Sequence, residues 1–219
     1  MKIPILFEDE DLLVINKPPG IVVNRAQSVK EETIEDWAGK KLTSQVERSG
    51  IVHRIDKETS GCLLIAKTPH VFFELQRQFK EREIHKTYLA IVHGSLVPEE
   101  GEIRAPVGRL PWNRERFGIV PGGREAMTKY KVRKSDDNYS FVELYPQTGR
   151  THQIRVHLKY INHPIVGDYL YAGRKTSRAD RQVVGRVMLH AWKISFTHPS
   201  TKKLVTVEAP IPDDMMKVA

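Results

Sequence analysis

The sequence predicts an α+β fold, with a few helices packed on a mixed and mostly antiparallel sheet. Short apolar or alternating runs, which are typical of strands, outnumber the segments with helical spacing. Most connections between these runs are shorter than the dozen residues that a crossover helix needs. A chain of 219 residues with 40% hydrophobic residues is long enough to bury its own core. We expect one domain over residues 1–219, although two small units would also fit this length.

The N-terminal region predicts a hairpin. Residues 5–7 and 12–15 are apolar runs on either side of an acidic turn. The second strand should end at Lys17-Pro18-Pro19-Gly20, because proline cannot donate to a strand ladder and glycine permits a turn. A helix is then expected after Thr33, because Thr33 followed by Asp36 resembles a weak capping box.

A second helix is expected to begin at Thr68-Pro69, where a capping hydroxyl precedes a proline that needs no donor. Its apolar face carries Phe72, Leu75 and Phe79. A third helix is expected over residues 152–161, and Pro164 stops it.

The other apolar runs predict strands. The expected strands cover residues 88–92, 129–132, 141–144, 187–189, 193–197 and 203–207. Between the first two lies a segment punctuated by proline and glycine, residues 109–124, which we interpret as an arm.

Positive charge is concentrated toward the C-terminus. The net charge is +8 in total: residues 1–60 contribute −2, residues 61–149 contribute +3 and residues 150–219 contribute +7. Such an excess favours a polyanionic partner, although a solvated basic face would have the same composition.

Several classes of protein do not fit the sequence. A single cysteine excludes a disulfide framework, no apolar run spans a bilayer, and the acidic start is unlike a signal peptide. We therefore expect a cytoplasmic protein that does not enter membranes. Glycine loops for phosphate and metal-ligand spacings do not occur; His152 and His157 would lie on different faces of a helix. The sequence predicts no metal and no nucleotide or flavin cofactor.

Three segments carry candidate reactive groups. Asp56, flanked by Arg54 and Lys57 before a Thr-Ser-Gly turn, should stay ionised and act as a nucleophile; aspartates at turns more often only accept backbone N–H bonds. Arg155 would share a helix face with His152 and Lys159, or form part of a solvated basic stripe. Tyr88 would enter a strand, where tyrosines usually serve packing.

These segments belong to a set of motifs that follow one another along nearly the whole chain. In order, the motifs are Asn16-Lys17-Pro18-Pro19-Gly20, His53-Arg54-Ile55-Asp56 with Thr59-Ser60-Gly61, Lys86-Thr87-Tyr88, Pro106-Val107-Gly108-Arg109, residues 122–128, residues 149–155, Pro164-Ile165-Val166-Gly167-Asp168, and Leu189-His190-Ala191 through His198-Pro199. The ordered set resembles the RluA-type RNA pseudouridine synthases. Ile55 stands where leucine is more usual, which conserves volume.

The resemblance implies a central, mainly antiparallel sheet in two halves with flanking helices and a basic cleft. It also implies a monomeric catalytic domain that needs no cofactor. Residues 1–11 leave no room for the small N-terminal RNA-binding domain of many relatives, so we expect none here.

The resemblance also implies the role of each site residue. Asp56 is the catalytic carboxylate, and Arg155 pairs with it. Tyr88 stacks on the target base and assists removal of the proton from carbon 5. The base leaves the RNA stack to reach them. Arg54 fills the vacated space and Ile154 packs beside the base.

RNA binding is expected along the arm, which interleaves aromatic residues with arginines that suit a stem–loop of ribosomal or transfer RNA. The residues assigned to substrate binding, besides Arg54 and Ile154, are His53, Arg109, Arg114, Arg116, Arg150 and His152.

Two other functions compete with this interpretation. A non-catalytic RNA-binding module would have no use for Asp56 in a basic cleft. A hydrolytic nucleosidase or glycosylase would need a second carboxylate to activate water, for which the motifs offer Glu58 and Asp168.

Overall fold

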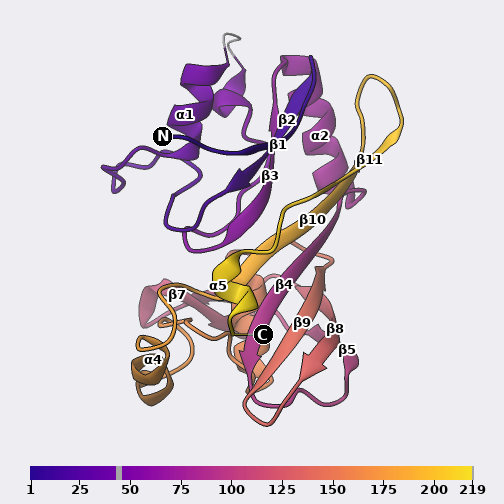
Figure 1. Cartoon of the computed structure of the whole chain (residues 1–219). Coiled ribbons are helices and arrows are strands. Elements are labelled where there is room, and N and C mark those ends of the chain that lie inside the picture. The colour runs from indigo at the N-terminus through magenta and orange to yellow at the C-terminus, as the bar shows by residue number, and fades with distance from the viewer. Residues whose placement is uncertain (43–45, 219) are drawn as a thin grey trace. The chain divides into compact units, whose positions relative to one another are not determined.

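The computed structural model describes residues 1–42 and 46–218, except for the side chains of residues 114 and 115. The chain folds into two compact units. The first unit comprises Met1–Lys86 and Ala191–Pro210, and the second comprises Thr87–His190 and the C-terminal segment from Ile211. Two strands, β4 (His85–His93) and β10 (Leu189–Thr197), have residues in both units (Figure 1).

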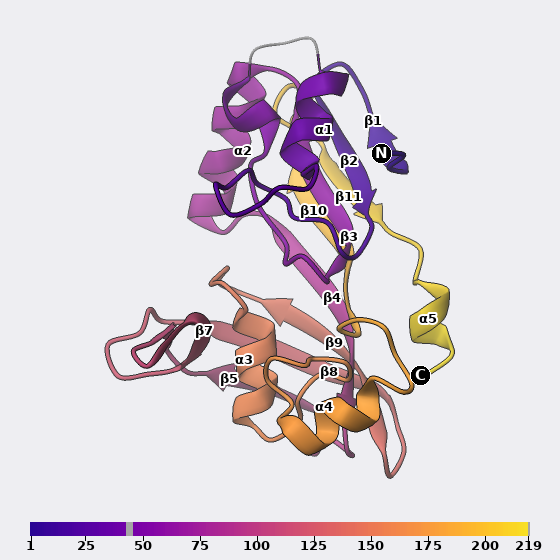
Figure 2. The same cartoon turned by 90° about the vertical axis from the view of Figure 1, so that its left-hand side faces the viewer.

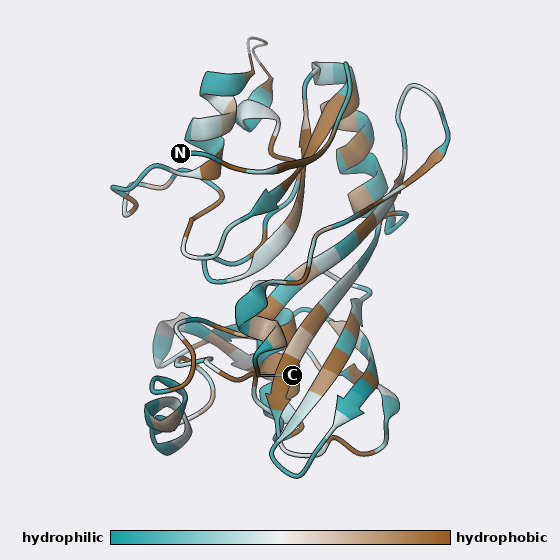
Figure 3. Cartoon of the chain, viewed as in Figure 1, coloured by the Kyte–Doolittle hydropathy of each residue, from teal (hydrophilic) through white to brown (hydrophobic). Residues whose placement is uncertain are grey.

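The first unit is a sheet with helices packed against it. Its other elements are β1 (Ile5–Glu8), β2 (Leu12–Lys17), α1 (Ile34–Lys41), the 3-10 helix η1 (Glu47–Gly50), β3 (Ser60–Ala66), α2 (Pro69–Glu81) and β11 (Leu204–Glu208). The strands lie in the order β1-β2-β3-β10, with β11 paired to β10. Buried side chains of β2, β3, α2 and β10 form its core, and the apolar stretches of β3 and α2 stand out in Figure 3.

The hairpin and both helices predicted near the N-terminus are confirmed. β1 pairs antiparallel with β2, and the Asp9 carboxylate accepts the N–H groups of Asp11 and Leu12 in the turn, each at 2.9 Å. The N–H of Asp36 donates to the Thr33 hydroxyl at 3.1 Å and the Asp36 carboxylate accepts the Thr33 N–H at 2.9 Å, which completes the capping box. Thr68 caps α2 in the predicted way.

The second unit combines a sheet with a separate hairpin. Its other elements are β5 (Glu100–Arg104), β6 (Val107–Leu110), β7 (Asn113–Ile119), β8 (Met127–Ser135), β9 (Tyr139–Pro146), α3 (Gln153–Tyr160), α4 (Arg174–Asp180) and α5 (Asp213–Met216). The strands lie in the order β4-β9-β8-β5, and all three neighbouring pairs are antiparallel. The predicted strands at 88–92, 129–132 and 141–144 are confirmed, and so is the α+β class.

Most of the predicted arm, residues 109–124, belongs to the β-hairpin of β6 and β7, so Gly118 lies inside a strand and does not interrupt it. Gly108 of β6 pairs with Gly118 of β7, where a Cβ would lie 2.5 Å and 2.7 Å from the side chains of Val120 and Leu110. The glycines therefore serve close packing inside strands. α3 runs beside this hairpin (Figure 2).

Other elements also differ from the prediction. The predicted run 193–197 lies in β10, which begins at Leu189, so only the last residue of the run 187–189 joins that strand; the buried His190 and Ala191 continue it. α4 has no apolar face: its two buried residues are Ser177 and Asp180, so its sequence carries no hydrophobic periodicity. No helix within the described ranges combines the length and apolar character of a membrane span.

Candidate active site

Asp56 lies in the first unit, at the end of an extended segment that leads into β3. It follows the buried Ile55, and its carbonyl accepts the N–H of Thr59 at 3.1 Å across a turn at Lys57-Glu58. The predicted Thr-Ser-Gly turn is therefore wrong, since Ser60 and Gly61 already belong to β3. Gly61 has φ of +110°, and a Cβ there would lie 2.2 Å from the Ala191 carbonyl, so close backbone approach explains this glycine.

A buried lysine fixes this turn from below. Lys17 is fully buried, and its Nζ donates to the carbonyls of Pro18 at 2.8 Å, Ile21 at 3.0 Å and Lys57 at 3.0 Å. The Lys57 carbonyl also accepts the N–H of Gly20 at 2.8 Å. The Lys-Pro-Pro-Gly loop is thus tied to the residue after Asp56. The sequence analysis predicted only that this loop ends the strand. The signal that could have indicated its contact with the turn is a lysine at the end of an apolar strand.

His53 supports the same segment through its ring. Its Nε2 accepts the N–H of Leu64 at 2.9 Å, and the ring packs on Phe79 with centroids 4.7 Å apart. Burial, with a smaller contribution from the positive charge of Lys86, lowers the pKa of His53 to about 3. The imidazole is therefore neutral and structural in these contacts; its predicted contact with substrate stays a prediction.

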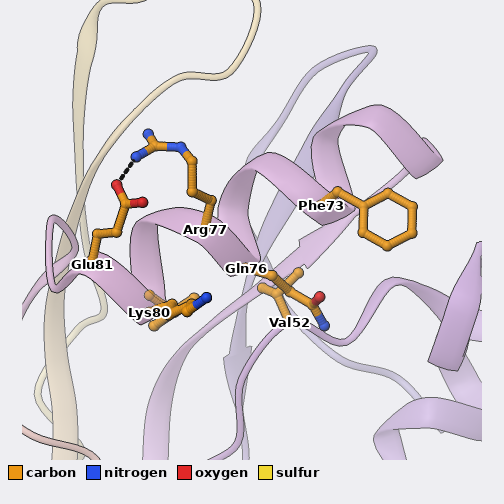
Figure 4. Close-up of a pocket in the computed structure, with 7 residues that line it drawn as sticks. Val52, Phe73, Gln76, Arg77, Lys80 and Glu81 are labelled. Carbon is orange, nitrogen blue, oxygen red and sulfur yellow. Dashed lines mark hydrogen bonds and ion pairs between the residues drawn. The ribbon is translucent and has the colours of Figure 1, made fainter.

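An open groove borders the segment that leads to Asp56. Its walls are Val52 and one face of α2, where Phe73 is 60% exposed and lies on the same stripe as Gln76 and Lys80 (Figure 4). Arg77 at its rim is ion-paired, and its carboxylate partners are Glu74, Glu81 and Glu83. Arg54, two residues before Asp56, is exposed.

In the second unit, Arg155 forms a bidentate ion pair with Asp168. Nε and Nη2 of Arg155 each lie 2.8 Å from a carboxylate oxygen of Asp168, which is fully buried. The guanidinium also lies over the Tyr171 ring, 5.1 Å from its centroid. Asp56 belongs to the other unit, and its predicted pairing with Arg155 stays a prediction.

The predicted basic face of the third helix is wrong. Arg155 is buried because Asp168 supplies its counter-charge, and Lys159 alone of the three residues is exposed. His152 precedes the helix as its N-cap, with φ of 55°. Its Nδ1 lies 2.8 Å from the Tyr171 hydroxyl.

Two polar residues that sequence reasoning missed fasten α3 to β8. The Gln153 amide donates to the Met127 carbonyl and the Thr128 hydroxyl at 3.0 Å each, while its oxygen accepts the Arg150 N–H at 3.0 Å. His157 is fully buried between the Thr128 hydroxyl and the Ala105 carbonyl, both at 3.0 Å. Burial lowers the pKa of His157. Both residues therefore position the helix that carries Arg155.

Three other predicted site residues lie in the second unit: Tyr88, Ile154 and Arg150. Tyr88 is half-buried in β4 opposite Leu144, and Ile154 is buried in α3. Arg150 donates through Nε to the Glu125 carbonyl at 3.1 Å.

Three of the predicted arginines lie on the β6–β7 hairpin. Arg109 and Arg116 are exposed, and the Arg109 guanidinium lies 5.2 Å from the Phe117 ring centroid. The side chain of Arg114 lies outside the described residues. Across the part of the chain that the structure describes, no three His, Cys, Asp or Glu side chains are grouped to hold a metal ion.

Comparison with known proteins connects these two regions to one family. Residues 11–160 match the family model of RNA pseudouridylate synthase. The chain is 42% identical to a ribosomal large subunit pseudouridine synthase D of Nitrosomonas europaea over 96% of its length, and spans 62% of that protein. It is 39% identical to an uncharacterised RNA pseudouridine synthase of Bacillus subtilis, covering 100% of this chain and 72% of the relative.

Solved structures agree with the sequence comparison. The structure of human RNA pseudouridylate synthase domain containing 1 matches 95% of this chain and 83% of its own, with a TM-score of 0.77 and 29% identity. The chain belongs to the RNA pseudouridylate synthase family, in its RluA-type branch. The fold predicted from the resemblance, an α+β pseudouridine synthase fold, is thereby confirmed.

Proposed function

We propose that this protein isomerises uridine to pseudouridine in a structured RNA, with Asp56 as the essential carboxylate. The observation that carries the proposal is the family match over residues 11–160, which includes the segments of Asp56, Tyr88 and Arg155 in the order of the resembled motifs. The two units together act as one catalytic domain in this proposal.

The reaction conserves all atoms except for an exchanged proton. The bond between N1 of uracil and the anomeric carbon breaks, and a bond from C5 of the base to that carbon forms. C5 loses its proton to solvent and N1 gains one. Attack of Asp56 on the sugar, attack on the base, and proton removal by Asp56 in a glycal route all need an ionised carboxylate at this position.

The neighbouring residues have complementary roles in the proposal. Arg155, held by Asp168, pairs with the Asp56 carboxylate and orients it, as the resemblance implies. Tyr88 stacks on the flipped base, Ile154 packs beside it, and the exposed Arg54 fills the space that the base leaves.

The substrate we propose is a stem–loop of ribosomal or transfer RNA, held along a basic cleft. Arg109 and Arg116 on the β6–β7 hairpin are exposed and suit phosphates and unpaired bases. Large-subunit ribosomal RNA is the first candidate, because relatives at 40–42% identity are named for it. We propose that the protein acts in the cytoplasm and as a monomer.

Of the two carboxylates that the motifs offer to a hydrolase, Asp168 is disfavoured by its position in the structure. This carboxylate is fully buried and forms two hydrogen bonds with Arg155, so it is not placed to activate a water molecule.

The decisive experiment is Asp56→Asn, assayed on RNA carrying tritium at C5 of uridine. The isomerisation releases that tritium to water, whereas a hydrolase would release free uracil. The near-isosteric variant should fold normally and lose more than about 100-fold in rate, because an amide cannot replace the carboxylate. Glu58→Gln, two residues away, is the matched control and should stay active. Retention of more than a hundredth of the rate by Asp56→Asn would overturn the assignment.

A further inference from the structure

Tyr171 touches three parts of the second unit that the proposed function uses. Its ring lies under the Arg155 guanidinium, 5.1 Å from Cζ to centroid. Its hydroxyl accepts the backbone N–H of Phe117 in β7 at 3.1 Å and lies 2.8 Å from Nδ1 of His152. Tyr171 has no role in any of the motif assignments above.

The hydrogen-bond chemistry of the hydroxyl fixes the direction of its bond with the hairpin. The Phe117 N–H is a donor only, so the Tyr171 oxygen accepts there. The direction of the bond between the hydroxyl and His152 Nδ1 is set by the imidazole tautomer. The three rings pack edge to face: His152 lies 5.6 Å from Phe117 and 5.7 Å from Tyr171.

The backbone of Tyr171 is tied to the partner of Arg155 as well. Its N–H donates to Asp168, lying 3.1 Å from the carbonyl and 3.3 Å from Oδ1. The same Oδ1 accepts from Arg155 Nη2. Tyr171 therefore contacts both members of the ion pair, one through its ring and the other through its backbone.

On its other side, Tyr171 reaches a hairpin that forms its own two-stranded sheet. Phe117 gives its N–H to Tyr171 and its ring face to the exposed Arg109. The apolar attachment beneath the hairpin is small: Val107, Ala126 and Val156 are buried there, with Phe117, Ile119 and Tyr171 packed against them. Phe117 therefore contacts Arg109 through its ring and the Tyr171 hydroxyl through its N–H, so it connects the two residues.

We propose that Tyr171 is a positioning residue that couples the RNA-binding hairpin to Arg155. The hydrogen bond from the Phe117 N–H to its hydroxyl, which we call the latch, holds the hairpin in the orientation that binds RNA. Its ring supports the Arg155 guanidinium. The inference rests on the proposed function, because it takes Arg109 as an RNA contact and Arg155 as part of the active site.

The two roles are separable by substitution. Tyr171→Phe keeps the ring and removes the latch, so KM for RNA should rise about 3- to 10-fold, as loss of the hydrogen bond to the hairpin implies, while kcat stays within two-fold. Tyr171→Leu removes both, and kcat should fall about five-fold or more in addition, since the cation–π support of Arg155 is lost. Rescue of kcat but not of KM by phenylalanine is a pattern that a general loss of stability would not produce.

Hydrogen exchange tests the latch without any turnover. In Tyr171→Phe, the amide of Phe117 should exchange at least five-fold faster than in the wild type. Tyr160→Phe, which alters an exposed tyrosine at the end of α3, is the control and should change neither the exchange rate nor KM.

The outcomes separate this inference from the proposed function. If the wild-type protein converts no uridine but Phe117 exchanges faster in Tyr171→Phe, the latch stands and the coupling to catalysis is refuted with the proposed function. If the wild-type protein is active and Tyr171→Phe leaves both KM and Phe117 exchange unchanged, the inference is overturned while the proposed function stands.

Discussion

The two units hold their candidate reactive groups in different ways. In the first unit, the turn at Asp56 is fixed through the backbone. The buried Lys17 donates to the Lys57 carbonyl and to the carbonyls of Pro18 and Ile21. In the second unit, Asp168 and Tyr171 bind the Arg155 guanidinium itself. In the first unit, the residue that fixes the turn can therefore be mutated without changing Asp56. In the second unit, the contacts that fix the site are made by the Arg155 side chain itself.

The largest effect that this comparison predicts is that of Arg155→Ala. The substitution leaves the Asp168 charge buried and unpaired, so the free energy of unfolding should fall by about 3–5 kcal/mol, and activity should be lost. Urea denaturation measures the loss of stability, and tritium release measures the activity.

Lys159→Ala, an exposed position on the same helix, is the control and should change stability by less than about 0.5 kcal/mol. An Arg155→Ala protein as stable as the wild type would show that the guanidinium does not depend on Asp168, and the contrast between the units would fail.

A smaller effect is expected from Lys17→Met in the first unit. Three carbonyls lose a charged donor, while the buried stem of the side chain is largely replaced, so we expect a loss of about 2–3 kcal/mol. Because Asp56 itself is unchanged, kcat should fall about ten-fold rather than vanish. Time courses of tritium release at saturating RNA measure kcat.

Lys57→Ala is the matched control, since it keeps the backbone carbonyl that Lys17 binds and removes only an exposed side chain. If Lys17→Met were as inactive as Asp56→Asn, the lysine would act on the reaction directly and not through the turn.

The smallest effect at neutral pH is expected for His53, which affects acid stability. The pKa of His53 is about 3 in the folded chain, against about 6.5 when unfolded, so the unfolded chain binds more protons between these values. Stability should therefore fall as pH decreases from about 6.5 toward 3. The buried His157 of the second unit adds a change of the same sign.

His53→Gln isolates the contribution of the first unit. The amide oxygen can still accept the Leu64 N–H, and the variant should be less stable at pH 7 by about 1 kcal/mol or less. Its melting temperature should decline less steeply than that of the wild type between pH 7 and pH 4. Parallel curves for the two proteins would mean that His53 is not held neutral.

Local signals made much of the first unit predictable. The caps at Thr33 and Thr68 and the acidic turn between β1 and β2 act within a few residues, and each formed the predicted element. Asp56 was recognised through the order of the motifs; from its own surroundings, a carboxylate at a turn is more often structural.

The second unit was less predictable because its contacts are distant in sequence. Arg155 is buried by Asp168, 13 residues later, and a helical wheel alone placed it on a solvated face. The prolines and glycines of residues 109–124 indicated an arm, yet Gly118 lies within β7 and pairs with Gly108 of β6. Such spacing rules see neighbours along the chain and not partners across a fold.

α3 has six consecutive buried residues, Gln153–Leu158, so no side of this helix faces water over more than a turn. A substitution or a shift of register over these residues therefore alters buried contacts, because their side chains do not extend into solvent. Attempts to evolve the protein toward a new RNA should therefore leave α3 constant and randomise exposed positions of the hairpin such as Arg109 and Arg116. Libraries divided in this way should retain far more folded members than libraries spread over the whole second unit.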